Sequence, residues 1–414
     1  MEASPAPERI LVIALHYPPA DGAAAIRARN LVRNLQALGH KVRVITPRRP
    51  IAGDVPPEAQ TVRWLDLEHL GRRAARRPPG SPQTMSPPAS WQRRLRTIAA
   101  RLAFPDLHAP WIPGAIAAAR REIADADLVL STGGASAHVV ARVVRGARPG
   151  IVDINDLWWA KALRQTGPIR DRVDRRLERW LVRSASALIV PVREQGVEVQ
   201  RRWGRSSTTV PTGFDAADFT FGANGSHPAG GEIIFAGNLY TFPLDVVFGV
   251  LGRGRAELGW TPEQLHLSFI GSCAAPALVA AETQGVTEFV VGTPRIPRRE
   301  LLQRLGNADA LLLPLFAEDP HHLPMRFFEF VGAGRPIIGF GSPTVPAARL
   351  MQQHDLGPVC ETTDELLAAL AQVASGTRQS SPSPSTRALF ELKNGRAALR
   401  ELIEQTTPGY RGDS

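Results

Sequence analysis

Short apolar runs rich in Leu, Ile and Val recur along the chain, and each is followed by a stretch whose apolar residues have helical spacing. In the first half these runs are ILVIALHY (10–17), KVRVIT (41–46), DADLVLST (125–132), GIVDIND (150–156) and SALIVPV (186–192). Continuous rather than alternating apolar residues are typical of strands that are buried on both faces. The pattern therefore predicts a parallel sheet covered by helices on both sides.

The second half of the chain repeats this plan. Its apolar runs are EIIFAG (232–237), LHLSFIG (265–271), TEFVVG (287–292), ALLLPLF (310–316) and RPIIGF (335–340). A length of 414 residues is sufficient for two ordinary domains. We therefore expect an α/β protein with two doubly wound domains in series.

The segment after the first run predicts an amphipathic helix. Ile26, Leu31, Leu35 and Leu38 follow helical spacing closely enough to form one apolar face. Arg27 lies among the polar positions, which we expect on the other faces. The helix is expected to pack on the first sheet through its apolar side.

Changes in composition divide the chain. Residues 213–230 are rich in Gly, Pro, Asn and Ser and show neither period, which is typical of an interdomain linker. We therefore predict a first domain over residues 1–212 and a second over residues 231–378. Residues 379–414 are expected to form a Pro/Ser linker and a last helix.

The net charge of +10 comes from arginines and is unevenly distributed. A basic zone at residues 72–101 suits phosphate groups on lipids or nucleic acids, or is a solvated surface. The polar N-terminus and the lack of an apolar run near the roughly 18 residues of a membrane span predict a cytoplasmic protein. Cys273 and Cys360 have no metal-ligand spacing, so we expect two buried thiols.

The most informative chemistry lies between residues 311 and 339. A strand ends near Pro314, a loop follows, and a helix is predicted from about Met325 to Val331. The amide groups and positive dipole end of that helix, together with Arg326, form a chemically reasonable diphosphate site. Glu329 lies one turn later and is able to accept both hydroxyls of a ribose.

This stretch resembles the donor-binding core of glycosyltransferase family 4. HYPPADGAAAIRARNLVRNLQALGHKVRVIT, DINDLWW, VPTGFDAADF and FAGNLY resemble further family segments in the expected order. The resemblance covers about 380 residues and implies a GT-B fold, with two Rossmann-like domains that face each other across a cleft. It also implies transfer of a sugar from a nucleotide-diphosphate donor with retained anomeric configuration, without metal or other cofactor.

The same resemblance assigns roles to individual residues. It implies that His138 contacts the transferred sugar, that Arg326 holds the diphosphate and that Glu329 holds the ribose, and we take these three as the catalytic candidates. The remaining expected donor-site residues are Gly22, Gly237, Asn238, Arg295, Ile296, His321 and His322. Asp153 and Asp156 follow a predicted strand, where α/β sheets place ligands, and are expected on the acceptor side.

We expect the acceptor to be a glycan or a lipid-linked sugar, in surface polysaccharide or glycoconjugate synthesis, with peripheral membrane contact through residues 72–101 and no nucleic acid partner. Two alternatives stay open. His321 stands where many family members have an acidic residue, and a basic residue is missing after FAGNLY. These departures suit a non-catalytic nucleotide-sugar-binding subunit. A nucleotide-sugar epimerase of the same architecture is the other alternative. The donor base and sugar are open.

Overall fold

The computed structural model describes residues 9–20, 22–49, 54–65, 103–155, 157, 167–220, 231–239, 241–315, 321, 323–377 and 381–407. The chain forms two compact units. Of the described residues, those between 9 and 212 and between 392 and 407 form unit 1, and those between 213 and 391 form unit 2. The chain therefore leaves unit 1 after Thr212 and returns to it after Glu391.

Unit 1 is built on a parallel sheet with the strand order β3-β2-β1-β4-β5-β6-β7. The strands are β1 (Arg9–Ala14), β2 (Lys41–Pro47), β3 (Ala59–Val62), β4 (Leu128–Thr132), β5 (Gly150–Asp153), β6 (Ala187–Val190) and β7 (Thr208–Thr209). The order reverses between β1 and β4. Doubly wound sheets bind ligands at the carboxyl ends of the strands at such a switch point.

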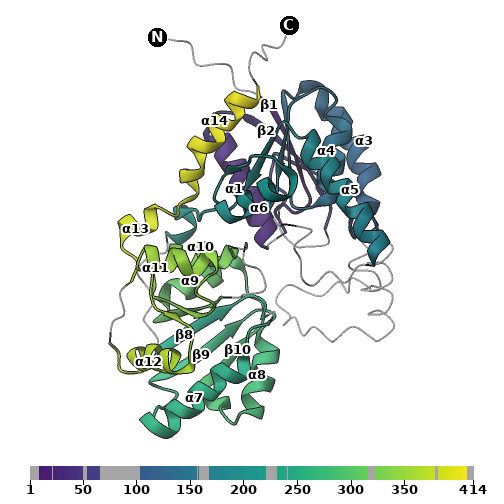
Figure 1. Cartoon of the computed structure of the whole chain (residues 1–414). Helices are drawn as coiled ribbons and strands as arrows, with labels where there is room; N and C mark the ends of the chain where they lie inside the picture. The colour runs from purple at the N-terminus through teal and green to yellow at the C-terminus, as the bar shows by residue number, and fades with distance from the viewer. Residues whose placement is uncertain are drawn as a thin grey trace. The chain divides into compact units, whose positions relative to one another are not determined.

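Helices cover both faces of this sheet (Figure 1). They are α1 (Ala23–Ala37), α3 (Ile112–Glu122), α4 (Ala135–Val144), α5 (Pro168–Ser184), α6 (Arg193–Trp203) and α14 (Arg396–Thr406), with short 3-10 turns at Ala109–Trp111, Ile123–Asp125 and Leu392–Gly395. Helices α1 and α14 pack on one face through Leu31, Leu35 and Leu399. Helices α3 and α4 bury Ala115 and Val140 on the other.

Unit 2 repeats the architecture with the strand order β10-β9-β8-β11-β12-β13, all parallel. The strands are β8 (Gly231–Ala236), β9 (Leu265–Ile270), β10 (Val290–Thr293), β11 (Ala310–Leu315), β12 (Ile337–Gly341) and β13 (Val359–Cys360). The helices are α7 (Leu244–Leu258), α8 (Ala274–Thr283), α9 (Arg298–Asn307), α10 (Met325–Ala333), α11 (Pro346–Gln353), α12 (Thr363–Ala374) and α13 (Pro384–Ala388), with 3-10 turns at Ala216–Phe219 and Thr287–Phe289. The order reverses between β8 and β11, which defines a second switch point.

The predicted strands and the helix at Met325 are confirmed, whereas the boundaries differ in two places. Residues 213–220 belong to unit 2, where Phe214 pairs with Phe390 through the backbone, so this part is no linker. The last helix begins only at Arg396, and it belongs to unit 1. The edge strands β3, β7 and β13 were not predicted. Strands β7 and β13 have only two residues each, and β3 (AQTV) contains two polar residues and no apolar run.

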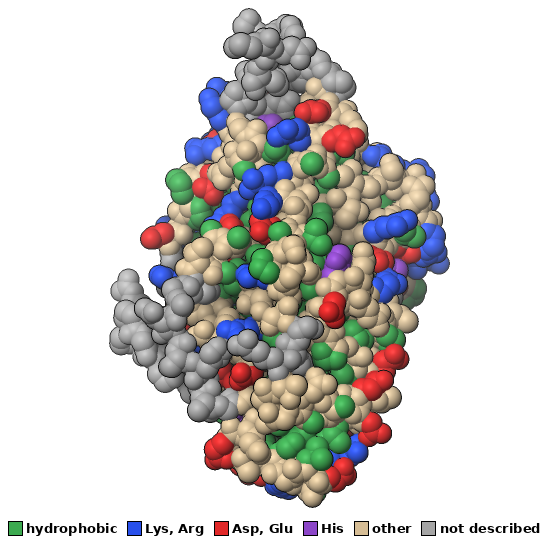
Figure 2. Space-filling model, turned by 90° about the vertical axis from the view of Figure 1, so that its left-hand side faces the viewer, with side chains coloured by type: hydrophobic (Ala, Val, Ile, Leu, Met, Phe, Trp, Pro, Cys, Tyr) green, Lys and Arg blue, Asp and Glu red, His purple; other side chains and the backbone are tan. Residues whose placement is uncertain are grey.

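Positive and negative side chains are interspersed on the face shown in Figure 2, with small groups of hydrophobic side chains between them. The described part of the chain contains no helix with the length and hydrophobicity that crossing a bilayer requires. Both cysteines are free and buried, as predicted. The basic zone at residues 72–101 lies outside the described residues.

Candidate functional site

The expected donor-site residues of unit 2 gather at the carboxyl edge of its sheet. Gly237 and Asn238 follow β8, Arg295 and Ile296 follow β10, and α10 follows β11 after a loop. Strands β8 and β11 are neighbours at the switch point. The fold therefore brings these residues to the edge where doubly wound sheets bind ligands.

Helix α10 begins after Pro324 and ends at Gly334, which has a left-handed φ of +69°. Pro fits the start of a helix because its missing N–H is not needed there, and Gly fits the end because it has no Cβ. Phe327 and Phe330 are buried and fix the helix against the sheet. This orientation leaves Arg326 half-buried in the first turn.

Glu329 is engaged by two arginines. Its carboxylate, only 1% exposed, accepts short hydrogen bonds from Arg326 on the same helix and from Arg298 on α9. Arg298 also reaches Asp218 at 3.2 Å. Glu329 therefore lies within an ion-pair cluster rather than open to a ribose. Arg298, which the sequence did not predict as a site residue, completes this cluster. Arg298 lies only two residues beyond Ile296, one of the expected donor-site residues, and this proximity in sequence is the signal that points to it.

Burial and two further arginines both act on Arg326. Burial and then the neighbouring charge of Arg298 lower the pKa of Arg326 to about 10, and Arg295 acts in the same direction. A guanidinium group beside other guanidinium groups is stabilised by an added anion. The arrangement therefore suits a diphosphate next to the first turn of α10.

Gly237 supports the same edge. Its φ of +129° is a conformation that L side chains rarely adopt, and its N–H donates to Ile270 at 3.1 Å. The hydroxyl of Ser272 donates to the Gly237 carbonyl and to the side chain of Asn238. Asn238 is exposed, so it is held in place yet accessible.

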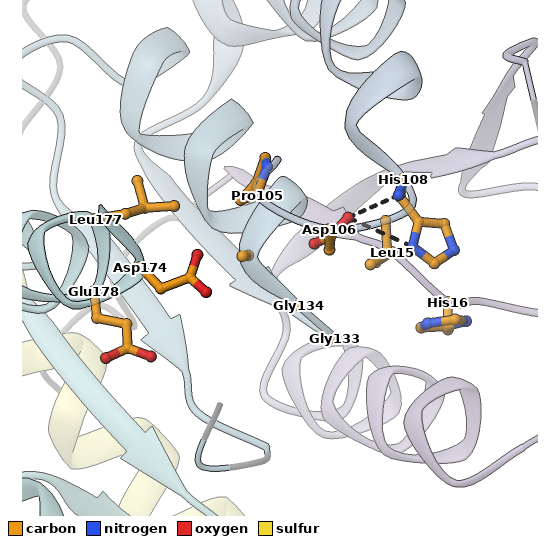
Figure 3. Close-up of a pocket in the computed structure, with 11 residues that line it drawn as sticks. Leu15, His16, Pro105, Asp106, His108, Gly133, Gly134, Asp174, Leu177 and Glu178 are labelled. Carbon is orange, nitrogen blue, oxygen red and sulfur yellow. Dashed lines mark hydrogen bonds and ion pairs between the residues drawn. The ribbon is translucent and has the colours of Figure 1, made fainter. Parts of the chain in front are cut away.

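Unit 1 contains a pocket of about 190 Å³ at its own switch point (Figure 3). Its lining residues are Leu15, His16, Pro105, Asp106, His108, Gly133, Gly134, Ala135, Asp174, Leu177 and Glu178. Leu15 and His16 follow β1, and Gly133 and Gly134 follow β4. Gly134 has a φ of +151°, and a Cβ there would lie 2.8 Å from the Leu15 side chain, so the loop requires glycine.

A polar network forms one side of the pocket. Asp106 accepts hydrogen bonds from the amides of His108 and Ser136 at 2.8 and 2.9 Å and from the Ser136 hydroxyl. Although burial raises the pKa of Asp106, the hydrogen bonds from His108 and Ser136 lower it to about 2. Arg49 donates to Nε2 of His108 at 3.0 Å and to Nδ1 of His16 at 3.2 Å. Because an arginine only donates, these two imidazole nitrogens act as acceptors.

Helix α5 forms the opposite side of the pocket, with Asp174, Leu177 and Glu178 across from Asp106 in Figure 3. Asp174 pairs with Arg170 at 3.0 Å, and Glu178 pairs with Arg202 at 3.5 Å. Both walls therefore present carboxylates, and hydroxyl groups of a ligand are suitable donors to them.

The structure places His138 in the core of unit 1. Its ring is 1% exposed, lies outside the pocket lining, and its Nδ1 is 2.8 Å from the Ser131 hydroxyl. Desolvation lowers the pKa of His138 to about 4 despite the opposing charges of Asp153 and Asp106. It is a neutral core residue, and the histidines that line the pocket are His16 and His108.

Asp153 also differs from its expected acceptor role. Its carboxylate is fully buried and accepts hydrogen bonds from Arg27 and Thr132. Arg27, predicted on an outer face of the first helix, is equally buried. The observed hydrogen bonds of this carboxylate thus go to partners inside unit 1.

The other expected residues lie apart from these clusters. Gly22 precedes α1 in unit 1 and is exposed, and His321 is half-buried four residues before α10. Asp156 and His322 lie outside the described residues. In the described part of the chain, no group of three or more His, Cys, Asp and Glu side chains is placed to hold a metal ion.

Comparisons with known proteins agree with this architecture. Residues 22–218 match Glycosyltransferase Family 4. Sucrose-phosphate synthase from Thermosynechococcus elongatus has a TM-score of 0.66 at 15% identity, with 96% of this chain and 98% of that chain covered. The chain has the GT-B fold of glycosyltransferases.

Two further GT-B structures are similar over nearly the whole chain. The pneumococcal O-GlcNAc transferase GtfA, in complex with UDP and GlcNAc, gives a TM-score of 0.61 at 11% identity and covers 97% of this chain and 99% of its own. WaaG, a glycosyltransferase involved in lipopolysaccharide biosynthesis, gives 0.57 at 15% identity and covers 97% and 100%. No curated protein matches the sequence significantly. The predicted GT-B fold is confirmed, and the family match supports a glycosyltransferase.

Proposed function

We propose that the protein transfers a sugar from a nucleotide-diphosphate donor to a glycan or lipid-linked acceptor. The observation that carries this proposal is the position of Arg326. It lies in the first turn of α10 at the switch point of unit 2, where burial and the charges of Arg298 and Arg295 lower its pKa. An anionic diphosphate relieves this unfavourable concentration of positive charge.

The same cluster suits the departure of a diphosphate leaving group. Negative charge develops on the leaving oxygen in the transition state, and preorganised donors stabilise it. Arg326 and the amides of α10 are such donors, so the guanidinium charges do the work that a metal or other cofactor does elsewhere. We propose retention of the anomeric configuration, with the departing phosphate oxygen taking the proton of the acceptor hydroxyl.

In this proposal Glu329 changes partners when the donor binds. Arg298 already has a second carboxylate, Asp218, at 3.2 Å. If Arg298 turns fully to Asp218, one oxygen of Glu329 becomes available to the ribose hydroxyls. The pocket of unit 1, with its Asp106 and Asp174 carboxylates, is the proposed binding site for the acceptor sugar.

The biological context is proposed by analogy. The similarity to WaaG, a glycosyltransferase involved in lipopolysaccharide biosynthesis, supports synthesis of a surface polysaccharide or glycoconjugate. The structure of GtfA in complex with UDP makes uridine diphosphate the first ligand to test.

Calorimetric titration with uridine, guanosine, adenosine and thymidine diphosphates tests the donor site. We expect one of them to bind, and its sugar conjugate to be consumed only when a glycan or lipid-linked acceptor is added. Proton NMR of the product would report the anomeric configuration. Release of an epimerised donor without acceptor would indicate the epimerase, binding without turnover would indicate a supporting subunit, and no binding at all would reject the proposal.

A further inference from the structure

Helix α5 carries a surface on which arginines and apolar side chains share one stripe. The exposed positions are spaced by three or four residues, so they fall on one side of the helix. We define the α5 stripe as Ile169, Arg172, Val173, Arg176, Arg179, Trp180 and Arg183, all of which are exposed. The spacing follows from helix geometry alone, whereas the mixture of residue types requires an explanation.

The apolar members of the stripe are unusually open to water. Ile169 is 75% exposed, Trp180 is 42% exposed and Val173 is 39% exposed. Scattered apolar residues on a surface are normal, but several on one face of one helix mark an interaction surface.

The charges of the stripe have one sign. Asp174 and Glu178 of α5 are buried on the pocket side, where they pair with Arg170 and Arg202. Asp171 is half-buried. Among the described residues of α5, the fully exposed charged side chains are therefore all arginines. Arg142 of α4 adds a further cation, 5.2 Å from the Trp180 ring.

The opposite side of the same helix lines the pocket of unit 1. Asp174, Leu177 and Glu178 line the cavity, and Figure 3 shows them on the side across from Asp106 and His108. A surface that binds the outer side of α5 therefore lies within one helix diameter, about 10 Å, of the pocket wall. This distance suits an acceptor whose sugar enters the pocket while its lipid stays in a membrane.

We propose that the α5 stripe binds the surface of an anionic lipid bilayer. Exposed Ile and Trp side chains beside arginines are the composition of helices that lie in the headgroup region. The arginines attract lipid phosphates, while their aliphatic stems accompany the apolar side chains into the interface. A nucleic acid would use the arginines but would gain nothing from Ile169 and Val173. The stripe would hold the membrane from which a lipid-linked acceptor reaches the pocket. Only this link to the acceptor depends on the proposed function.

The test is cosedimentation of the full chain with vesicles. One set contains phosphatidylcholine with phosphatidylglycerol, and the other contains phosphatidylcholine alone. We expect the protein to bind the anionic vesicles at least about tenfold more tightly, and less so at high salt. Equal binding to both kinds, or no binding to either, would overturn the proposal.

Two pairs of substitutions identify the surface. Arg172→Glu with Arg176→Glu should weaken binding to anionic vesicles by at least about tenfold, because charges that attracted lipid now repel it. Ile169→Ser with Trp180→Ser should weaken it by about tenfold, because the inserted apolar area is lost. The matched control is Lys41→Glu with Arg400→Glu, which makes the same charge change at exposed positions of unit 1 outside the stripe. Arg400 lies on α14, on the other face of the sheet.

If the control loses binding as much as the stripe variants, or if the stripe variants keep it, α5 is not the binding surface. Nucleoside diphosphate titration of the same variants separates this proposal from the proposed function. All variants should keep the donor affinity of the wild type, which also verifies that they are folded. If the stripe variants lose vesicle binding but keep donor binding, the stripe is supported. If the wild type binds and turns over the donor but does not bind vesicles, the proposed transferase function stands and the stripe is rejected.

Discussion

Arg27 on α1 and Asp153 at the end of β5 form a fully buried ion pair, with Nη2 of the arginine 2.6 Å from the carboxylate. The remaining donors of Arg27 bind the Val210 carbonyl and the Thr212 hydroxyl, both at 3.0 Å. About two turns further along the same helix, Asn34 donates to the Leu392 carbonyl at 2.9 Å. Helix α1 therefore fastens the chain to unit 1 both where it leaves this unit and where it returns.

Replacing Arg27 by leucine should lower the free energy of unfolding by about 3–5 kcal/mol, because the Asp153 carboxylate is left buried and unpaired. Urea unfolding followed by circular dichroism measures the change. Arg43→Leu is the control, since Arg43 forms an exposed pair with Glu122 and should cost at most about 1 kcal/mol. Equal losses of unfolding free energy for the two variants would show that the buried ion pair stabilises the protein no more than the exposed one.

His138 should make the stability depend on pH. Its pKa is lowered from 6.5 to about 4 in the folded chain, so protons bind the unfolded chain more readily. The neutral ring contributes stability above pH 6.5, and that contribution is lost as the pH falls toward 4. The loss from this group should approach about 3 kcal/mol.

Urea midpoints of the wild type and His138→Gln at pH 7, 5.5 and 4 check this prediction. The variant lacks the titrating group, so its midpoint should fall less steeply with pH than that of the wild type. It should also retain donor turnover once corrected for the folded fraction, because the ring does not reach the pocket. Parallel pH profiles, or a variant that is folded but inactive, would contradict this role.

Asp106 caps a helix from a distant part of the chain. The N-cap residue of α4 is Gly134, which has no side chain, so the first amides of the helix have no local side-chain cap. Asp106 accepts from the Ser136 amide and hydroxyl instead. Asp106→Ala should therefore cost about 1–2 kcal/mol of stability and widen the pocket.

The control for Asp106 is Asp215→Ala, which removes a similar cap from the short 3-10 turn of unit 2. We expect Asp106→Ala to raise KM for the acceptor and to leave the affinity for the nucleoside diphosphate unchanged. A loss of donor affinity in this variant, with unit 1 folded, would mean that the pocket does not serve the acceptor.

The sequence predicts the two sheets well because buried parallel strands are continuous apolar runs, as in ILVIALHY and ALLLPLF. It also predicts the helix that contains Arg326 and Glu329, because that helix follows a buried strand. The sequence predicts Arg27 on an outer face of its helix, because a helical hydrophobic pattern treats every arginine as a polar surface residue. Its partner Asp153 lies 126 residues away, and only the fold brings them together.

The sequence did not predict the pocket residues for a related reason. His16, Asp106 and His108 come from two loops, and Arg49 comes from a third, so no local spacing links them. His138 stood out because it lies in a segment that resembles a known family. Its burial is decided by the packing of α4 on the sheet, which a single sequence does not reveal.

Arg326 should bind the phosphates of the donor rather than its nucleoside. Arg326→Ala removes a charged donor at the first turn of α10 and should weaken binding of the nucleoside diphosphate about 10- to 100-fold, the effect of losing charge-assisted hydrogen bonds of roughly 1.5–3 kcal/mol. Affinity for the bare nucleoside should be unchanged. Arg326→Lys should recover only part of the loss, because an ammonium group lacks the planar fork of a guanidinium.

The control for Arg326 is Arg255→Ala. Arg255 lies on α7 of unit 2 and forms an exposed pair with Glu288. Calorimetric titrations of the four proteins with diphosphate and nucleoside separate the two halves of the ligand. An equal loss of nucleoside binding would mean that Arg326 shapes the base pocket. An unchanged diphosphate affinity would mean that the anion site lies elsewhere on the sheet edge, since the cluster of Arg326, Arg298 and Arg295 would then be structural.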